Sequence, residues 1–254
     1  MTMFLSTLLA LTTTAAAWTG STEPSAQQGE HLYRVLTVRA APGRLLDLID
    51  LYKEQRGILE AAGDGELFWM RHSQGDQWDL LLMFPMGSFA EYYSAARVRA
   101  RAQRRGTSGR TGTEIQKAID AASTWREELY ARGPGVDVLK ERFEGAGLFH
   151  VEMFIALPDK REELLEQRNM ENAYYRTLDR DENLIFVREA GAAWDLFTLG
   201  FYDDLEDFAR AGDLPAEDKE RAAREAGFEA ANLIGTYLRS LMLRHNDTLA
   251  GPVG

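Results

Sequence analysis

The sequence predicts an α+β fold in which two ferredoxin-like units follow one another along the chain. Three observations predict it. The chain has 254 residues, 45% hydrophobic and 27% charged, with no cysteine, which is the composition of a globular protein without disulfides. The tripeptide Trp78-Asp79-Leu80 returns as Trp194-Asp195-Leu196, 116 positions later. Strand and helix patterns occur in the same order around both copies.

The constant spacing of 116 positions divides the chain into two units. It pairs hydrophobic, turn and helix-start residues without a gap: Leu32 with Leu148, Val35 with Val151, Pro42 with Pro158, Leu48 with Leu164, Glu66 with Glu182, and Gly75 with Gly191. We therefore assign residues 31–145 to the first unit and residues 146–254 to the second, each near the common domain size. Residues 1–30 precede both units.

The amino terminus has the pattern of a secretory signal peptide. A short apolar segment begins at Met3 and ends in Ala15-Ala16-Ala17, so we expect cleavage after about Ala17. It is too short and too rich in threonine for a spanning helix, which needs ~20 apolar residues. No basic residue precedes it, and an amino terminus without a targeting role is the alternative. Residues 20–29 form a polar spacer, and we expect a secreted or periplasmic protein that is not bound to the membrane.

Each unit is expected to begin with a strand, Leu32–Arg39 or Leu148–Leu157, and proline then suits the first turn of a helix. Apolar residues at helical spacing predict that helix: Leu45, Leu48, Ile49, Tyr52 and Leu59 in the first unit, and Leu164, Leu165, Tyr174 and Leu178 in the second. Two strands around a glycine-containing turn follow: Glu66–His72 and Gln77–Phe84, then Asn183–Arg188 and Ala193–Phe201.

Each unit is expected to end with two helices and a strand. The short helices begin near Ser88 and near Asp203-Asp204, where these residues are good N-caps. Helical spacing predicts longer helices that reach Leu129 in the first unit and Met242 in the second. A fourth strand is predicted at Val136–Phe143, and a weaker one at Thr248–Val253.

This order of elements, together with the repeat, resembles the dimeric α+β barrel superfamily over residues 31–254. The resemblance implies that the two ferredoxin-like units pack sheet against sheet as a pseudo-dimeric α+β barrel within one chain. Members include cofactor-free monooxygenases, haem-degrading enzymes, haem peroxidases, chlorite dismutases and lactone isomerases. No catalytic motif accompanies the resemblance, so it implies a fold and leaves the reaction open.

Alternation along the first strand of each unit separates two faces. We expect the apolar face to contact the helices; it contains Tyr33, Val35, Thr37, Phe149, Val151 and Met153. We expect the mixed face to line the space between the sheets; it contains Arg34, Leu36, Val38, His150, Glu152 and Phe154. Because a polar group in such a space must be paired or hydrated, Arg34, His150 and Glu152 are the candidate catalytic residues.

His150 and Glu152 lie two residues apart on a predicted strand, so their side chains share a face. This spacing suits a general base with an orienting carboxylate, or two ligands of a metal ion. A buried hydrogen-bonded pair without a catalytic role is the alternative. The sequence supplies no third ligand at the spacing of a metal-binding motif, so we predict no metal site.

Four further residues on the predicted strands are candidates for ligand binding: Trp69, His72, Phe154 and Arg188. They could line an apolar pocket, and the alternatives are ordinary core positions and solvated strand ends. Asp79 and Asp195 follow a repeated tryptophan, which indicates a structural task such as accepting backbone N–H bonds or pairing with arginine.

His245 lies at the end of the last predicted helix. Haem-binding members of the superfamily have an axial histidine, so the resemblance makes His245 the fallback cofactor-binding residue. The alternative is a positive charge that complements the helix dipole. We expect no cofactor, with haem through His245 as the exception.

The chain has 29 basic and 40 acidic residues and a net charge of −11, which disfavours nonspecific binding to nucleic acid or an anionic membrane. A local basic run from Arg97 to Arg110 is interpreted as a solvated face and linker, with capture of an anion as the alternative. Phosphate-loop, dinucleotide-binding, serine-hydrolase and zinc-protease motifs are absent from the sequence.

Together these features predict an exported protein that binds a small molecule, with the reaction and the oligomeric state undetermined. One alternative is a cofactor-free monooxygenase or isomerase, with His150 as the base and Glu152 or Arg34 as its helper. The other is a noncatalytic interaction protein. These hypotheses differ in whether Arg34, His150 and Glu152 converge in a concave, partly apolar cavity.

Overall fold

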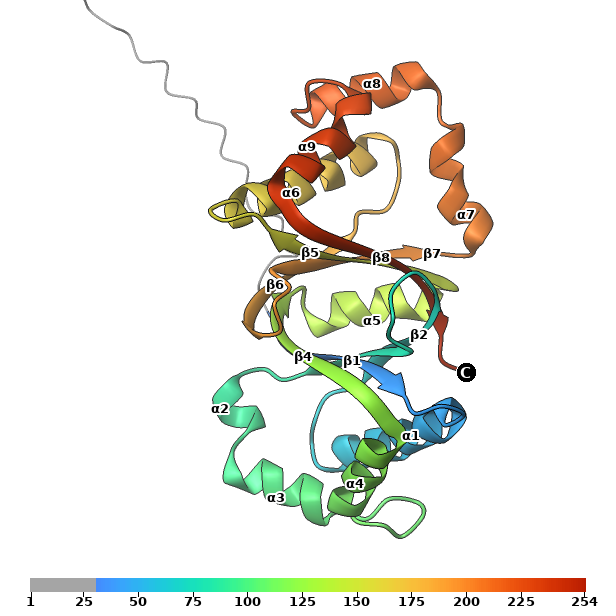
Figure 1. Cartoon of the computed structure of the whole chain (residues 1–254), viewed down its shortest axis with the longest axis vertical. Helices are drawn as coiled ribbons and strands as arrows, with labels where there is room; N and C mark the ends of the chain where they lie inside the picture. Colours follow the sequence, from blue (N-terminus) through green and yellow to red (C-terminus); the bar gives the residue numbers. More distant parts are fainter. Residues whose placement is uncertain (1–30) are drawn as a thin grey trace, which may run out of the picture.

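The computed structural model describes residues 31–254, and within them eight antiparallel strands form a closed barrel with helices outside it (Figure 1). The predicted signal peptide and spacer lie outside the described residues. The strands are β1 (His31–Ala40), β2 (Phe68–Gln74), β3 (Leu80–Pro85), β4 (Ser123–Gly133), β5 (Leu148–Ala156), β6 (Leu184–Gly191), β7 (Leu196–Tyr202) and β8 (Met242–Pro252). Their order around the barrel is β1-β3-β2-β8-β5-β7-β6-β4.

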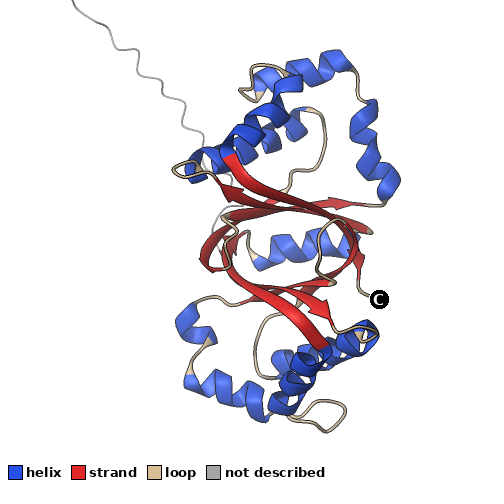
Figure 2. Ribbon diagram, in the orientation of Figure 1, coloured by secondary structure: helices blue, strands red, loops and turns tan. Residues whose placement is uncertain are grey.

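The helices cover the barrel on opposite sides (Figure 2). One group is α1 (Leu45–Ala61), α2 (Phe89–Tyr92), α3 (Ala95–Gln103) and α4 (Gly112–Ala122). The other is α6 (Arg161–Thr177), α7 (Leu205–Ala209), α8 (Ala216–Glu225) and α9 (Ile234–Leu241), with short 3-10 turns at Arg210–Asp213 and Ala231–Leu233. In the described residues, no helix has both the length and the hydrophobicity needed to cross a bilayer.

The barrel consists of two four-stranded sheets. We call β1–β4 with α1–α4 the first half, and β5–β8 with α6–α9 the second half. The strand orders are β4-β1-β3-β2 and β8-β5-β7-β6. In both sheets the fourth strand of the half is therefore followed by its first, third and second strands. Pairing of β2 with β8 and of β4 with β6 joins the sheets edge to edge, so neither sheet has a free edge.

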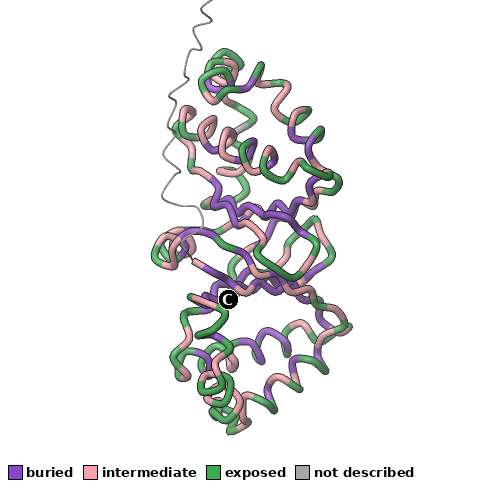
Figure 3. Tube along the Cα trace, turned by 90° about the vertical axis from the view of Figure 1, so that its left-hand side faces the viewer, coloured by how far each residue is buried: buried purple, intermediate pink, exposed green. Residues whose placement is uncertain are grey.

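The interior of the barrel is filled by one helix, α5 (Val136–Gly145), which lies between the sheets (Figure 1). Leu139 of α5 is fully buried among interior side chains of both halves, including Tyr33, Val35, Phe149 and Val151. Figure 3 shows the buried residues concentrated along the strands at the middle of the molecule. The interior is therefore a shared hydrophobic core.

The sequence-based assignment of strand faces is wrong. Tyr33, Val35, Phe149, Val151 and Met153 belong to the interior core between the sheets. The face with Arg34, Leu36, Val38, His150, Glu152 and Phe154 lies against the outer helices, as the packing of Leu36 and Val38 on α1 and of Phe154 on α6 and α9 indicates. Both faces of each sheet are covered, so alternation separates the two faces but does not identify which one meets helices.

The predicted ends of both units also need correction. Val136–Phe143 is helical and belongs to α5, whereas the fourth strand of the first half is β4. The last strand, β8, begins at Met242, so His245 lies on a strand rather than on a helix. β4 follows α4 and β8 follows α9 without a loop. The apolar residues on both sides of each junction therefore have the spacing expected of one longer helix.

The repeated Trp-Asp motif has the predicted structural task. Asp79 Oδ2 accepts a 2.8 Å hydrogen bond from Ala40 N, and Asp195 Oδ2 accepts one of 2.9 Å from Ala156 N. Asp195 also pairs with Arg188 at 2.5 Å. The tryptophans before these aspartates are both buried in the interior core. The motif thus fixes the end of the first strand of each sheet.

Candidate functional site

The outer face of the first sheet and the helices above it enclose a cavity of about 430 Å³, which we call the Arg34 cavity. Arg34 on β1 lies between Phe84 of β3 and Tyr130 of β4 in the strand register. Side chains of α1, α3 and α4 complete the lining, which includes Gln55, Ile58, Leu59, Val98, Arg101 and Gln116. The volume is in the range of small-molecule sites, and the lining is mixed apolar and polar.

Arg34 is the charged residue on the sheet side of this cavity. Its Nη2 donates a 2.8 Å hydrogen bond to Glu128 Oε2, and its guanidinium lies 5.5 Å from the centre of the Phe84 ring. Burial alone would lower the pKa of Arg34, but the hydrogen bond to Glu128, the charge of Glu128 and the neighbouring tyrosines Tyr92 and Tyr93 together raise it, so the group stays charged. Its Nε is buried and has no hydrogen-bond partner within residues 31–254.

Two tyrosines extend the hydrogen bonds of Arg34. The hydroxyls of Tyr93 and Tyr130 lie 2.6 Å apart, and Tyr130 donates to Glu128. Burial would raise the pKa of Glu128, but the hydrogen bonds from Arg34 and Tyr130 outweigh it and lower the pKa. Tyr93, Tyr130, Glu128 and Arg34 thus form a continuous line of hydrogen bonds that includes two cavity-lining residues, Arg34 and Tyr93.

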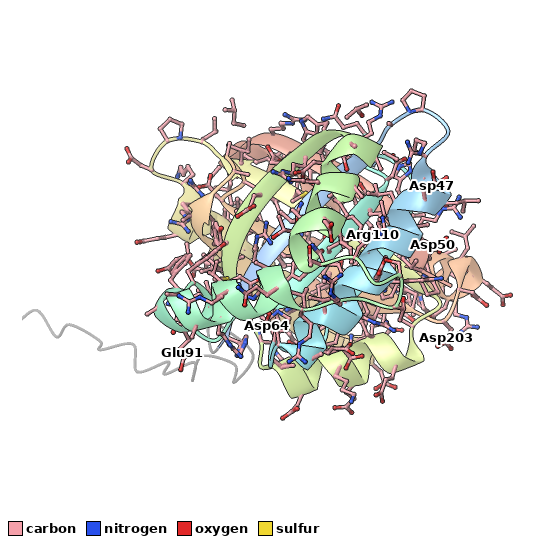
Figure 4. All side chains as sticks on the ribbon, turned by 90° about the horizontal axis from the view of Figure 1, so that it is seen from below. Asp47, Asp50, Asp64, Glu91, Arg110 and Asp203 are labelled. Carbon is pink, nitrogen blue, oxygen red and sulfur yellow. The ribbon has the colours of Figure 1, made fainter. Side chains whose placement is uncertain are left out.

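A larger groove of about 730 Å³ lies between α1 and the loop after α3. Two ion pairs lie along it: Arg110 with Glu54 at 2.7 Å, and Arg44 with Asp47 at 2.5 Å. Figure 4 shows Arg110 beside α1, with Asp47 and Asp50 on that helix. We favour the Arg34 cavity as the candidate site because its lining is more apolar and because Arg34 Nε lacks a hydrogen-bond partner in residues 31–254.

Arginines of the basic run from Arg97 to Arg110 contact acidic and carbonyl groups near the end of α1. Arg101 binds Asp64 through a 2.6 Å hydrogen bond from its Nε, and Arg97 lies 3.7 Å from the same carboxylate. Arg104 donates to the carbonyl of Ala61 at the end of α1. These contacts link α3 to the end of α1, so the run is not the solvated face and linker that the sequence predicts.

A second polar site lies on the outer face of the second sheet. We call His150, Glu152, His245 and Asp247 the His150 cluster. Glu152 on β5 is directly opposite Asp247 on β8 in the strand register. His150 Nε2 is 3.0 Å from Asp247 Oδ1, and His245 Nε2 is 3.4 Å from the same oxygen and 3.5 Å from Glu152 Oε1. Four groups able to donate electron pairs to a ligand therefore converge here.

The buried side chains of Thr198 and Arg168 contact the second carboxylate oxygen of Glu152. Glu152 Oε2 accepts a 3.0 Å hydrogen bond from Thr198 Oγ1 and one of 3.4 Å from Arg168 Nη1. Arg168, on α6, is 2% exposed and also pairs with Glu171. Burial would raise the pKa of Glu152, but His245 and Arg168 outweigh it and lower the pKa. Glu152 is therefore ionised.

The carboxylates of Glu152 and Asp247 change the pKa of His245. Burial would lower the pKa of His245, but Asp247 and Glu152 outweigh it and raise the pKa to about 9. Burial would raise the pKa of Asp247, but the neighbouring imidazoles of His150 and His245 lower it well below its ordinary value. Without another cation in the cluster, His245 is protonated at neutral pH.

The predicted catalytic residues do not form one site. His150 and Glu152 lie together in the His150 cluster, whereas Arg34 lies in the Arg34 cavity of the other half. The partners Asp247 and His245 of the His150 cluster were missed. Their signal is the pair of tripeptides His150-Val151-Glu152 and His245-Asn246-Asp247, which places both acids beside both histidines once each tripeptide lies on a strand.

The four predicted ligand-binding residues are also spread over the barrel. Trp69 is buried in the helix-facing core of the first half. His72 packs edge-on against Trp78, with ring centroids 5.7 Å apart. Arg188 is bound by Asp195, whereas Phe154 stacks under His245 with ring centroids 4.7 Å apart. Of the four, Phe154 contacts the His150 cluster.

A haem on His245 does not fit this arrangement. An axial nitrogen needs the open face of a porphyrin in front of it. In front of His245 Nε2 lie Glu152 Oε1 at 3.5 Å and Asp247 Oδ1 at 3.4 Å, and the imidazole is fixed by its stacking on Phe154.

No family model matches the sequence, and no curated protein is similar to it. Solved structures are similar in shape. An anthrone oxidase-like protein is 12% identical, with 89% of this chain and 92% of that chain covered at a TM-score of 0.54. A candidate monooxygenase from Lactobacillus acidophilus NCFM is 6% identical, with 86% and 92% covered at 0.49. A candidate chlorite dismutase is 13% identical, with 88% and 95% covered at 0.47. At these identities the first similarity establishes a shared fold and no more.

Proposed function

We propose that this chain, which has the dimeric α+β barrel fold, binds a small, partly apolar anion in the Arg34 cavity. The observation that carries the proposal is the guanidinium of Arg34, which is charged, partly buried and bound to Glu128 through Nη2, while its buried Nε has no acceptor in the described part of the chain. A carboxylate or phenolate would accept from this group. Ile58, Leu59 and Phe84 would contact an apolar body.

The charge requirement is tested with a pair of probes that share one ring system. We use 2-naphthoate, an anion, and 2-naphthamide, its neutral analogue, in calorimetric titrations of the wild type and of Arg34→Gln. A charge-assisted hydrogen bond contributes about 1.5–3 kcal/mol, so Arg34→Gln should weaken naphthoate binding roughly 10- to 150-fold. Naphthamide binding should change much less.

Arg126→Gln is the matched control, since Arg126 is an exposed residue of β4 that pairs with Asp120 at 2.7 Å. It should leave both probes unaffected. Equal binding of the two probes, or failure of both to bind the folded wild type at millimolar concentration, contradicts the proposal and favours a noncatalytic interaction protein.

A second candidate function is a cofactor-free oxygenase that acts on an acidic aromatic substrate in the same cavity. The observation that favours it is the hydrogen-bonded line Tyr93–Tyr130–Glu128, which offers a path for a proton out of the cavity. The similar structure named anthrone oxidase-like suggests anthrone as a probe. Oxidation of its methylene to a carbonyl consumes one O₂ and releases one water, so oxygen uptake that Glu128→Gln abolishes would support this function.

We also propose that the barrel arose by tandem duplication of a ferredoxin-like unit. In support, Asp79 and Asp195 make the same backbone contacts 116 positions apart, and α1 and α6 each have 17 residues at the same offset.

The proposal that the protein is exported rests on the sequence of residues 1–17 alone. Amino-terminal sequencing of protein recovered from the medium or periplasm, with cleavage after about Ala17, tests it.

A further inference from the structure

We propose that the His150 cluster is a binding site for a divalent transition-metal ion such as Zn²⁺ or Mn²⁺, with His150, Glu152, His245 and Asp247 as its ligands. The site lies in the second half and is independent of the Arg34 cavity. Two imidazoles and two carboxylates are the donors that such ions take in proteins.

The distances within the cluster fit a single ion. Ligand atoms of His150, Glu152 and Asp247 all lie within 4.8 Å of one another. Three of the closest separations in the cluster are 3.0, 3.4 and 3.5 Å. A tetrahedral ion with ligands at roughly 2.1 Å requires neighbouring ligand atoms to be roughly 3.4 Å apart. The ligand atoms of His150, Glu152 and Asp247 are therefore close enough together for one ion, and His245 lies beside two of them.

The strands supply this arrangement as a rigid framework. Each contributes a histidine and an acid two residues apart, so both side chains of the pair lie on the outer face. Antiparallel pairing sets Glu152 opposite Asp247 and brings the histidines to opposite corners of the group. Sites on strands are positioned more precisely than sites on loops.

An unsatisfied buried atom points independently to a ligand. His245 Nε2 is buried and makes no hydrogen bond within residues 31–254, although two carboxylate oxygens lie within 3.5 Å of it. Its ring is parallel to Phe154, at 8° between the planes, so it is fixed with this nitrogen toward the acids. An ion between the nitrogen and the carboxylate oxygens would satisfy this nitrogen.

The balance of charge also calls for a cation. The contacting groups include three carboxylates, Glu152, Glu171 and Asp247, and one guanidinium, that of Arg168. With neutral histidines these groups sum to −2, which a divalent ion neutralises. Thr198 and Arg168 bind Glu152 Oε2 and leave Oε1 toward His245. Such outer contacts orient a metal-binding carboxylate.

The ion could reach the site from solvent. The side chain of Asp247 is 57% exposed, whereas that of Glu152 is 9% exposed. The cluster is thus open on the Asp247 side and closed on the Glu152 side, so an exchangeable water could complete the coordination at the open position.

Metal titration of the full-length folded protein tests the site. Protein treated with EDTA and desalted is titrated with Zn²⁺ by calorimetry and with Co²⁺ by visible absorption. We expect one equivalent of each to bind, an intense Co²⁺ spectrum from a four- or five-coordinate site, and a thermal midpoint that rises with Zn²⁺. His245→Ala and Asp247→Asn should each weaken binding at least tenfold, because each removes a ligand.

Two matched variants serve as controls. His31→Ala removes a histidine at the start of β1, in the other half, and Asn246→Ala changes the residue of β8 that bonds to Asp76 instead. Both should bind Zn²⁺ as the wild type does, and circular dichroism verifies that every variant is folded. Three outcomes overturn the proposal: no binding of Zn²⁺ or Co²⁺ by the folded wild type, equal binding by His245→Ala and Asp247→Asn, or a haem Soret band that requires His245.

Discussion

Arg168 carries a charge at a position that is almost fully closed to solvent. It is 2% exposed and contacts both Glu152 and Glu171. Removing one partner of a buried ionic group leaves uncompensated charges behind. Residues of this kind decide whether the fold is stable at all.

We expect Arg168→Met to lower the free energy of unfolding by about 3–5 kcal/mol, because the buried carboxylate of Glu152 and the partly buried one of Glu171 lose their cation. Urea denaturation measures the change. Arg176→Met on the same helix is the control, since Arg176 pairs with Glu182 at the surface and is 61% exposed. The control should change stability by about 0–1 kcal/mol. Equal effects of the two substitutions would refute this account of the buried ionic group.

The protonation of His245 links stability to pH. In the metal-free protein its pKa is raised from 6.5 to about 9. A raised pKa adds stability that is fully present below pH 6.5 and is lost as the pH rises through about 9. The pKa values of Glu152 and Asp247 are lowered, so their contribution is present above the unfolded values and is lost in acid.

We therefore expect the urea midpoint of EDTA-treated protein to fall between pH 6.5 and 9.5, and we expect His245→Asn to lose most of this fall. The measurement is a series of urea titrations at fixed ionic strength. An identical decline in wild type and variant would show that His245 is not the responsible group.

At the scale of single elements, the turns that close the barrel depend on two glycines. Gly75 follows β2 with φ +117°, and a Cβ there would lie 2.1 Å from the backbone oxygen of Asp247. Gly191 ends β6 with φ +95°, and its Cβ would lie 2.5 Å from the oxygen of Glu128. Each glycine thus permits a hairpin of one sheet to approach the last strand of the other.

Gly75→Ala should destabilise the protein by more than Gly43→Ala. Gly43 also has a positive φ, of +75°, but nothing lies within 4 Å of a Cβ there, so its substitution isolates the backbone term of about 1–2 kcal/mol. The collision at Gly75 should add about 1–3 kcal/mol. Thermal unfolding of both variants provides the comparison, and equal losses would rule out the close approach as the reason for glycine.

The element junctions show where prediction from sequence stops. The strands β1 and β5, the helices α1 and α6 and both middle hairpins follow from apolar spacing and turn residues. The spacing of Ile115, Ala122 and Leu129 also fits one helix, yet the chain changes to a strand at Ser123. Pairing of β4 with β1 and β6 stabilises the strand there, and no local pattern reports that pairing.

At the scale of the whole molecule, the two halves share one interior core. Tyr33 and Leu129 of the first half, Phe149 and Phe197 of the second, and Leu139 of α5 all belong to it. Strand pairing across both seams adds to this connection. Each half also has a helix-facing core of its own, but the inner face of each sheet is buried against the other half and α5.

We expect residues 31–254 to unfold in one cooperative transition, with equal calorimetric and van't Hoff enthalpies. Differential scanning calorimetry of the EDTA-treated protein measures both quantities. Two resolved transitions would mean that the shared core does not couple the halves.

The outer faces of the halves differ although their strand orders agree. Arg34 and His150 occupy corresponding places on β1 and β5, as do Leu36 and Glu152. Around Arg34 the helices leave a cavity, whereas around Glu152 the space is filled by Arg168 and its partners. The proposed anion site and the proposed metal site thus belong to different halves.

The sequence by itself determined the α+β class, the spacing of 116 positions, the repeated Trp-Asp contacts and the residue types of both sites, because these depend on local spacing and side-chain chemistry. Only the tertiary structure decided that α5 fills the barrel, which face of each sheet meets helices, and that His245 and Asp247 join His150 and Glu152. The first two outcomes depend on how the sheets and helices pack, and the third depends on pairing between strand residues about 95 positions apart. Alternation along one strand carries no information about either.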